Sequence, residues 1–319
     1  MKVNEFMENL RKQLIEQRKI AESTSVQYLQ TLWKMNGSKP FTTLAFTKKL
    51  ADVQAVIDTY APSTQATMYV VLASALSTVS DKATYKKAYL HWRTKMKEAT
   101  DARKEEDPHK KTEAQEENWC DWDTVLKKKT DLAEQVQSFS TSSKALTAAQ
   151  FNTLLDFVVL SLYTDIPPRR NADFLLMDVL RKTPKEYDAS KNYYDLQANK
   201  FVFNIYKTAK TYGQALVEVP EDLQKTLALY IRHHPLAKSD RKLVGEFKLL
   251  VKADGTPLST VNSITRVLNR IFSKKVGSSM LRHSYITHKY AGVSEEMKED
   301  AAALGHSVAM QQGTYLKTE

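Results

Sequence analysis

Apolar residues recur at helical spacing through the first hundred residues of the chain. Phe6, Leu10 and Leu14 follow one another every four residues, and a second stripe runs from Tyr28 to Trp33 before Asn36-Gly37 ends it. Further helices are predicted over Phe46–Thr59, over Thr64–Val79, and from Asp81 to about Lys97. The pattern therefore predicts a small helical domain over residues 1–99.

Periodicity is lost in the next segment, where charged residues of both signs dominate. Between Asp101 and Thr130, 16 of 30 residues are charged, and Pro108 interrupts any long helix. Such a composition is typical of an exposed, mobile linker. We expect this linker to cover residues 100–143.

A second domain is predicted over residues 144–319, and it begins with a strongly apolar helix. Thr147 is a suitable N-cap for that helix. Its apolar positions are Phe151, Leu154, Leu155 and Val158.

Two short segments of this domain alternate apolar and polar residues, as strands do. They are Lys200–Tyr206 and Ala215–Val219, and Lys207–Gln214 joins them. The pattern predicts a β-hairpin whose loop carries Lys207, Lys210 and Tyr212.

The rest of the second domain is predicted to be mainly helical. The expected elements are a helix over Pro220–His234, a turn at Asp254–Pro257, a helix over Val261–Ile271, one beginning near Ser278-Ser279, and one from Ser294 to Leu304-Gly305. The predicted fold class is mainly α with a small antiparallel β-sheet, an α+β protein.

Composition supports this class and adds a preference for acidic partners. Eight glycines in 319 residues disfavour glycine-rich phosphate loops and turn-rich β-sandwiches. Lysine and arginine exceed aspartate and glutamate by ten, and the pI is near 9.3. The excess favours a polyanion, either nucleic acid or an acidic membrane surface.

Cysteine content and the apolar segments limit the remaining classes. Cys120 is the only cysteine, which excludes an internal disulfide and any multi-cysteine metal site. The start of the chain is polar and carries no secretory signal, and Ala61–Ser80 is too polar for a good membrane span. We therefore expect a soluble intracellular protein, in either the nucleus or the cytoplasm of its host.

Two places in the second domain combine cationic residues with turns. Ile166–Asp173 contains two prolines and then two arginines, of which Arg170 and Asp173 could form a simple surface ion pair. The loop segment Lys207–Lys210, taken alone, is a solvated hairpin tip.

Two further places lie near the end of the chain. Ser279–Ser284 contains Leu-Arg-His at a helix start, where backbone N–H groups and the helix dipole favour an anion. His306 follows Leu304-Gly305, and Tyr315 lies nine residues later. A lone histidine after a helix end is usually structural, and a lone tyrosine near the end of a chain usually serves packing.

The order and spacing of these groups resemble the tyrosine recombinase (phage integrase) family. The resemblance spans the second domain, and Leu281–Ser284 with Leu304–His306 and Tyr315 reproduces the closing motifs of the family. The helical first domain suits the family's core-binding domain. The Pro-Pro-Arg-Arg-Asn run further resembles integrases of protist DNA viruses, their satellite viruses and related mobile elements.

The resemblance assigns a role to each matching residue. Arg170, with Asp173 three residues on, would be the first catalytic arginine, and Arg169 is the competing choice. Lys207 would be the hairpin lysine, with Lys210 as second choice. The remaining assignments are Arg282 as the second arginine, His306 at the His/Trp position and Tyr315 as the nucleophile. Further DNA contacts are expected from Arg169, Lys210, Tyr212 and His283.

One position departs from the family pattern. The family's first histidine lies three residues before the second arginine, and Ser279 stands there in this chain. A serine can hydrogen-bond a phosphate oxygen, but it cannot store a proton near pH 7. The departure concerns how Tyr315 loses its proton and how fast.

These residue types suit the cleavage of a DNA phosphodiester. Two guanidiniums would stabilise the charge on the nonbridging oxygens while the tyrosine forms a 3′-phosphotyrosine and a lysine protonates the leaving 5′-oxygen. No metal, ATP or other cofactor is expected. The implied partners are double-stranded DNA and further copies of the chain, as a tetramer on DNA. Neither a membrane nor a small-molecule substrate is expected as a partner.

Two alternatives stay open from the sequence. One is a type IB topoisomerase-like enzyme, which would relax supercoiled DNA as a monomer at any site. The other is a catalytically impaired DNA-binding or architectural protein, which would bind DNA in a salt-dependent way and form no covalent adduct.

Overall fold

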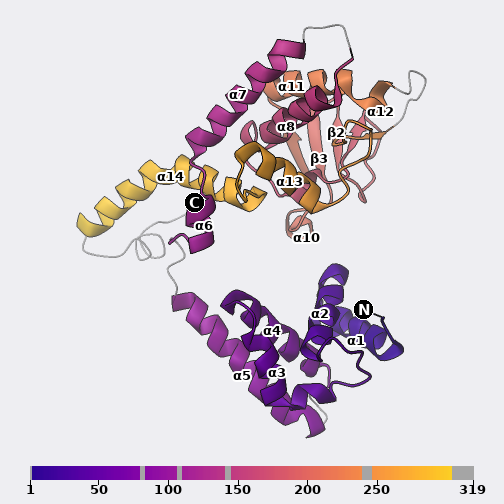
Figure 1. Cartoon of the computed structure of the whole chain (residues 1–319), viewed down its shortest axis with the longest axis vertical. Helices are drawn as coiled ribbons and strands as arrows, with labels where there is room; N and C mark the ends of the chain where they lie inside the picture. The colour runs from indigo at the N-terminus through magenta and orange to yellow at the C-terminus, as the bar shows by residue number, and fades with distance from the viewer. Residues whose placement is uncertain (1, 80–82, 106–109, 141–144, 239–245, 304–319) are drawn as a thin grey trace. The chain divides into compact units, whose positions relative to one another are not determined.

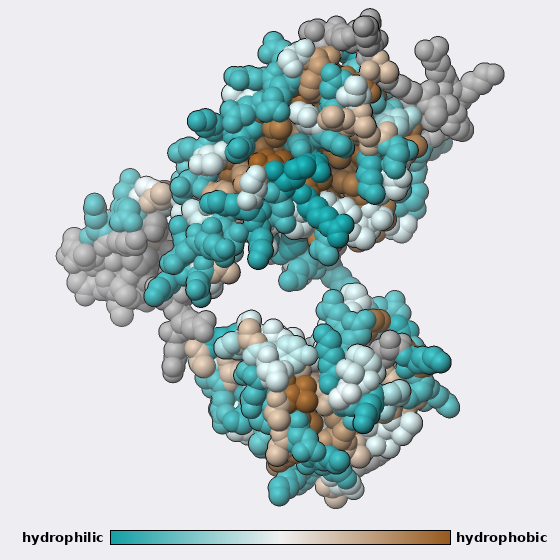
Figure 2. All heavy atoms as spheres, in the orientation of Figure 1, coloured by the Kyte–Doolittle hydropathy of each residue, from teal (hydrophilic) through white to brown (hydrophobic). Residues whose placement is uncertain are grey.

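A computed structural model describes residues 2–79, 83–105, 110–140, 145–238 and 246–303 (Figure 1). The chain divides into two compact units, Met1–Lys110 and Lys111–Glu319. Each unit has its own hydrophobic core. Hydrophilic side chains cover most of the visible surface of the second unit, whereas the visible face of the first unit mixes hydrophilic and apolar side chains (Figure 2). Among the described helices, none combines the length and apolar character that crossing a membrane requires.

The first unit is helical, as its apolar periodicity predicts. Its elements are α1 (Glu5–Arg18), α2 (Glu22–Met35), the 3₁₀ turn η1 (Ala45–Lys48), α3 (Leu50–Asp58), α4 (Pro62–Ser77) and α5 (Ala83–Glu105). Trp92 of α5 is fully buried, and its indole N–H donates to the carbonyl of Thr47 at 2.9 Å. The last helix continues to Glu105 and so crosses the boundary expected at residue 99.

The expected linker is largely helical. Residues 113–118 form α6 (Glu113–Asn118), and residues 122–140 form α7 (Trp122–Ser140), which belongs to the second unit and packs against its helix α8 (Ala148–Thr164). Trp122, Val125 and Val136 are buried in the core of that unit. The expectation of an exposed linker does not hold for these helices, because a few apolar residues at helical spacing among many charges suffice to bury one face.

The second unit is built around α8 (Ala148–Thr164), which is buried along most of its length. Thr147 caps α8 as expected, and the cap is reciprocal. The Thr147 hydroxyl accepts from the Gln150 backbone N–H, while the Gln150 side chain accepts from the Thr147 N–H. This fixes the start of the helix that leads directly to the Pro-Pro-Arg-Arg turn.

A five-stranded sheet in the order β4-β3-β2-β1-β5 packs beside α8. Its strands are β1 (Asp178–Leu180), β2 (Tyr193–Asp195), β3 (Lys200–Phe203), β4 (Ala215–Glu218) and β5 (Phe247–Lys248). The predicted hairpin is confirmed, since β3 and β4 pair antiparallel with Lys200 opposite Glu218. Its loop contains one short helix, α10 (Ala209–Tyr212).

The expectation of an antiparallel sheet is wrong, because the sheet is mixed. Strands β1 and β2 are parallel, with Asp178 opposite Tyr193. The segment 181–192 carries the chain back to the end of the sheet at which β1 starts. Strand β2 therefore begins at that same end and runs in the same direction as β1. Strand β5 then pairs antiparallel with the other side of β1.

The remaining helices of the second unit are α9 (Asn171–Phe174), α11 (Glu221–His233), α12 (Pro235–Lys238), α13 (Val261–Phe272) and α14 (Ser278–Ala303). Two helices were expected where α14 runs as one. Helix α14 continues through Gly292 and projects from the body of the unit (Figure 1). A glycine inside a helix costs only about 1 kcal/mol, so a glycine alone does not end one.

Candidate anion pocket of the second unit

A pocket of about 290 Å³ opens at the N-terminus of α14. It is lined by Pro167, Pro168, Ser279, Arg282, His283, Tyr285 and Ile286. The Pro-Pro-Arg-Arg turn and the Leu-Arg-His motif, which are far apart in sequence, therefore meet at one place. The first turn of α14 adds the partial positive charge of a helix N-terminus.

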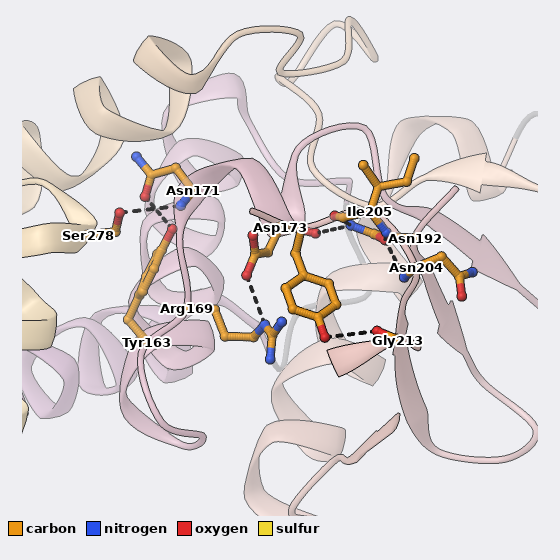
Figure 3. A network of polar contacts seen from close by, with 10 residues as sticks. Tyr163, Arg169, Asn171, Asp173, Asn192, Asn204, Ile205, Gly213 and Ser278 are labelled. Atoms are coloured by element: carbon orange, nitrogen blue, oxygen red, sulfur yellow. Dashed lines mark hydrogen bonds and ion pairs between the residues drawn. The ribbon is translucent and has the colours of Figure 1, made fainter. Parts of the chain in front are cut away.

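Asn171, at the start of α9, joins the two motifs through hydrogen bonds (Figure 3). Its backbone N–H donates to the Ser278 hydroxyl at 3.3 Å, and its amide nitrogen donates to the Thr265 hydroxyl at 2.9 Å. The Tyr163 hydroxyl donates to the Asn171 amide oxygen at 2.5 Å. Asn171 of α9 is thus connected to three other helices. Its buried side chain hydrogen-bonds residues of α8 and α13, and its backbone N–H hydrogen-bonds Ser278 of α14.

The two adjacent arginines of the turn have different environments. The Arg169 Nε lies 3.0 Å from the Asp173 carboxylate, and its guanidinium stacks over the Phe203 ring, 3.8 Å from the centroid. Arg170 is half-buried, and its guanidinium hydrogen-bonds no residue in the described part of the chain. Asp173 therefore pairs with Arg169, and not with Arg170 as the simple surface-pair interpretation has it.

The carboxylate of Asp173 is almost completely buried. Burial raises the pKa of Asp173 above its ordinary value, and the Arg169 guanidinium opposes that rise, as Arg170 does more weakly. One carboxylate oxygen, Oδ1, has no hydrogen-bond partner among the described residues. The ion pair with Arg169 is what compensates a charge at this depth.

Ser279 and Arg282 lie within the first five residues of α14 and share a face, since they are three residues apart. Ser279 is exposed and Arg282 is half-buried. Within the described residues, nothing hydrogen-bonds the Arg282 guanidinium, which leaves its donors free for an anion in the pocket. His283 is exposed at the rim.

Lys207 lies in the hairpin loop, just before α10, and is exposed. Lys210 is exposed within α10, and Tyr212 is 75% exposed at its end. The Tyr206 hydroxyl donates to the Gly213 carbonyl at 2.8 Å and so closes the loop across α10. The loop presents both lysines and Tyr212 to solvent.

The expected catalytic residues His306 and Tyr315 lie outside the described residues. Of the matched residues, Ser279, Arg282 and His283 line the pocket. The arginine turn contributes Pro167 and Pro168 to it, and neither Arg170 nor Lys207 lines it. In the described part of the chain, no group of three or more His, Cys, Asp or Glu side chains could hold a metal ion.

Sequence reasoning missed the residues that hold these groups in place. Asn171 and Asn192 are buried asparagines whose side chains bridge separate elements. The sequence signal for Asn171 is its position directly after Arg170 at a helix start. Asn192 has no local signal, because its partners come from other parts of the chain.

Comparisons with protein-family models, with curated proteins and with solved structures give no match.

Proposed function

We propose that this chain is a site-specific DNA recombinase of the tyrosine type, an integrase that cuts and rejoins strands through a 3′-phosphotyrosine. The observation that carries the proposal is the meeting of two arginine motifs at one pocket beside a helix N-terminus. Arg282 lines this pocket, and no protein group in the described part of the chain hydrogen-bonds its guanidinium, which suits a bound phosphate.

Arg170 and Arg282 are the proposed phosphate ligands. Each is half-buried and has no hydrogen-bond partner among the described residues. Fixed cations that meet the nonbridging oxygens stabilise the additional negative charge of the transition state. Arg169 is instead assigned a structural role, since Asp173 and Phe203 already engage it.

The reaction proposed at this phosphate balances without a cofactor. The Tyr315 phenol gives up its proton to solvent water as its oxygen attacks phosphorus, the bond from phosphorus to the 5′-oxygen breaks, and Lys207 gives a proton to that oxygen. The products are a 3′-phosphotyrosine and a free 5′-hydroxyl. Attack by the 5′-hydroxyl of a partner duplex reverses the chemistry and joins the exchanged strands.

His306 and Ser279 are proposed to add hydrogen bonds to the same phosphate. For His306 this requires a change in α14. From Arg282 to Ala303 a continuous helix rises about 32 Å, while the three residues on to His306 span at most about 11 Å. The proposed active arrangement therefore needs α14 to bend between Arg282 and Ala303.

The experiment that tests the function uses nicked duplexes with a randomised central region. We expect denaturing electrophoresis to reveal a covalent protein–DNA band that persists in EDTA, and sequencing of the trapped DNA to give the preferred site. The band should disappear in Tyr315→Phe. A band that persists in Tyr315→Phe would remove Tyr315 as the nucleophile.

The alternatives predict different outcomes in this assay and in companion assays of plasmid relaxation and strand exchange. Salt-dependent binding without any covalent band would indicate a DNA-binding or architectural protein. Relaxation of supercoiled plasmid by the monomer at many sites would indicate a topoisomerase-like enzyme. Strand exchange between two duplexes, carried out by an oligomer, is the outcome that the recombinase proposal requires.

A further inference from the structure

The segment that leads into the Lys207 loop is paired with a side chain, beyond the end of the hairpin ladder. Strand β3 ends at Phe203, and two residues later the backbone of Ile205 meets the amide of Asn192. The Ile205 N–H donates to the Asn192 amide oxygen at 2.7 Å, and the Asn192 amide nitrogen donates to the Ile205 carbonyl at 2.8 Å. The Asn192 side chain thus takes the place of a neighbouring strand.

The same amide also reaches the arginine turn. Its nitrogen donates a second hydrogen bond, to the carbonyl of Asp173 at 2.8 Å, and its oxygen accepts a second one, from the Asn204 N–H at 2.8 Å. Asn192 is only 6% exposed, and both donors and both acceptors of its amide are used. One side chain therefore ties α9, which follows Arg170, to the segment that precedes Lys207 (Figure 3).

A second contact runs parallel to this bridge. The Arg169 guanidinium, paired with Asp173, lies 3.8 Å from the centroid of Phe203 and 5.2 Å from that of Tyr206. Arg169 precedes Arg170 in the turn, and Tyr206 precedes Lys207 in the loop. The arginine and lysine segments are therefore joined twice, by a saturated amide and by a stacked cation.

We propose that Asn192 is a positioning residue that holds the Lys207 loop in register with Arg170. The inference rests on the proposed function, in which Lys207 protonates the leaving oxygen. A proton donor must lie within hydrogen-bond reach of its acceptor, and an exposed lysine on a free loop would spend little time there. The buried amide fixes the backbone two residues before the lysine, which limits how far its ammonium can travel.

The test is the covalent cleavage of a duplex in which sulfur replaces the 5′-bridging oxygen at the site found in the adduct selection. A thiolate leaves without a proton, so loss of the acid has little effect on this substrate. We expect Asn192→Ala to slow cleavage of unmodified DNA about 10- to 100-fold and to cleave the sulfur-containing duplex within about three-fold of wild type. Lys207→Ala should show the same selective rescue, and Arg282→Ala should not.

Two further variants control for folding. Asn192→Ser also removes the amide that bridges the two segments, but it leaves a hydroxyl group at the buried position. It replaces Asn192→Ala if the alanine variant does not fold. Val158→Ala removes apolar volume from the buried face of α8 and should affect both duplexes equally. In a Lys207→Ala chain, Asn192→Ala should add little on unmodified DNA, because the acid is already absent.

A readout without DNA separates this inference from the proposed function. Trypsin cleaves after lysine, and Lys207 and Lys210 are both exposed. Asn192→Ala should speed cleavage at these lysines about ten-fold, since the loop opens more often. An unchanged tryptic rate, or a cleavage defect that the sulfur-containing duplex does not rescue, would overturn the proposal. If the wild-type chain forms no adduct with either duplex, the proposed function fails, and the tryptic rate still decides whether Asn192 holds the loop.

Discussion

Two neighbouring arginines in the turn before α9 show how local environment separates residues of one type. Arg169 is paired with a buried carboxylate and stacked on an aromatic ring, whereas Arg170 has no hydrogen-bond partner in the described structure. Substituting each in turn should therefore separate stability from DNA chemistry.

We expect Arg169→Ala to lower the free energy of unfolding by about 2–4 kcal/mol, because Asp173 loses its only ion-pair partner in the described residues. Arg170→Ala should change it by less than about 0.5 kcal/mol and, on the proposed function, abolish the covalent adduct. Urea titration of both variants measures the first effect. Equal destabilisation would show that Arg170 also supports the fold.

His234 gives the second unit a dependence on pH. It is fully buried, its ring nitrogens face the Leu249 carbonyl and the Leu236 N–H, and burial lowers its pKa to about 4. The unfolded chain titrates near pH 6.5, so it binds the proton first and stability is lost as the pH falls from about 6.5 to about 4.

We expect this residue to contribute a loss of about 3 kcal/mol across that range. The measurement is the free energy of unfolding between pH 7 and pH 4 for wild type and His234→Gln, in which the group cannot titrate. Carboxylates affect both chains alike, so the difference between the two slopes isolates His234. Parallel slopes would show that the histidine accepts its proton within the folded chain.

At the scale of elements, α7 and α14 are the helices that differ most from the sequence prediction. Helix α7 buries Trp122, whose ring meets that of Tyr285 in α14 edge to face at 5.2 Å between centroids. Tyr285 also lines the anion pocket. A segment expected to be a linker therefore supports the helix that carries Arg282.

Trp122→Ala tests that support. We expect it to lower the free energy of unfolding by about 3–5 kcal/mol, the usual effect of removing a buried tryptophan. Trp119→Ala is the matched control, because Trp119 lies just before α7 and is only half-buried. A change below about 0.5 kcal/mol in Trp122→Ala would restore the interpretation of this segment as a linker.

The continuity of α14 can be tested at Gly292. Nothing lies within 4 Å of a Cβ built there, so alanine fits, and it should favour the unbroken helix by about 1 kcal/mol. If DNA cleavage requires a bend, Gly292→Ala should slow adduct formation about five-fold. Ala291→Gly has the opposite propensity and should leave the rate equal or higher. Unchanged adduct formation in Gly292→Ala would place the bend elsewhere or remove the need for it.

At the scale of the whole molecule, the chain is two units with separate cores and an overall charge of +10. If both units contact DNA, the full chain should neutralise more phosphates than either unit alone. We expect its affinity to fall more steeply with salt than that of residues 111–319, as measured by fluorescence anisotropy on a labelled duplex. Equal slopes would limit the DNA contacts to the second unit.

Elements that depend on a local sequence pattern could be predicted from the sequence, whereas pairings that depend on residues far away in the chain could not. Alternation along Lys200–Phe203 and Ala215–Glu218 predicted the hairpin, and Thr147 predicted the start of α8. The parallel pairing of β1 with β2 depends on the path of the segment between them, and short strands carry little periodicity.

The candidate site divides in the same way. The spacing of the Arg170 and Arg282 motifs was readable from the chain, but which arginine pairs with Asp173 depends on Phe203 and on the depth of the carboxylate. The role of Asn192 could not be predicted from the sequence, because its four hydrogen bonds go to residues more than ten positions before or after it in the chain.

The candidate anion pocket is assembled from the turn at Pro167-Pro168 and from a helix that begins more than a hundred residues later, at Ser278. A ribosome makes these pieces in order, so a nascent polypeptide carries the Pro-Pro-Arg-Arg turn long before Ser279–Ile286 has been translated. Chains that stop early, through truncated messages or stalled synthesis, lack the second wall altogether. Newly made protein can therefore form this pocket only after Ser279–Ile286 has been translated.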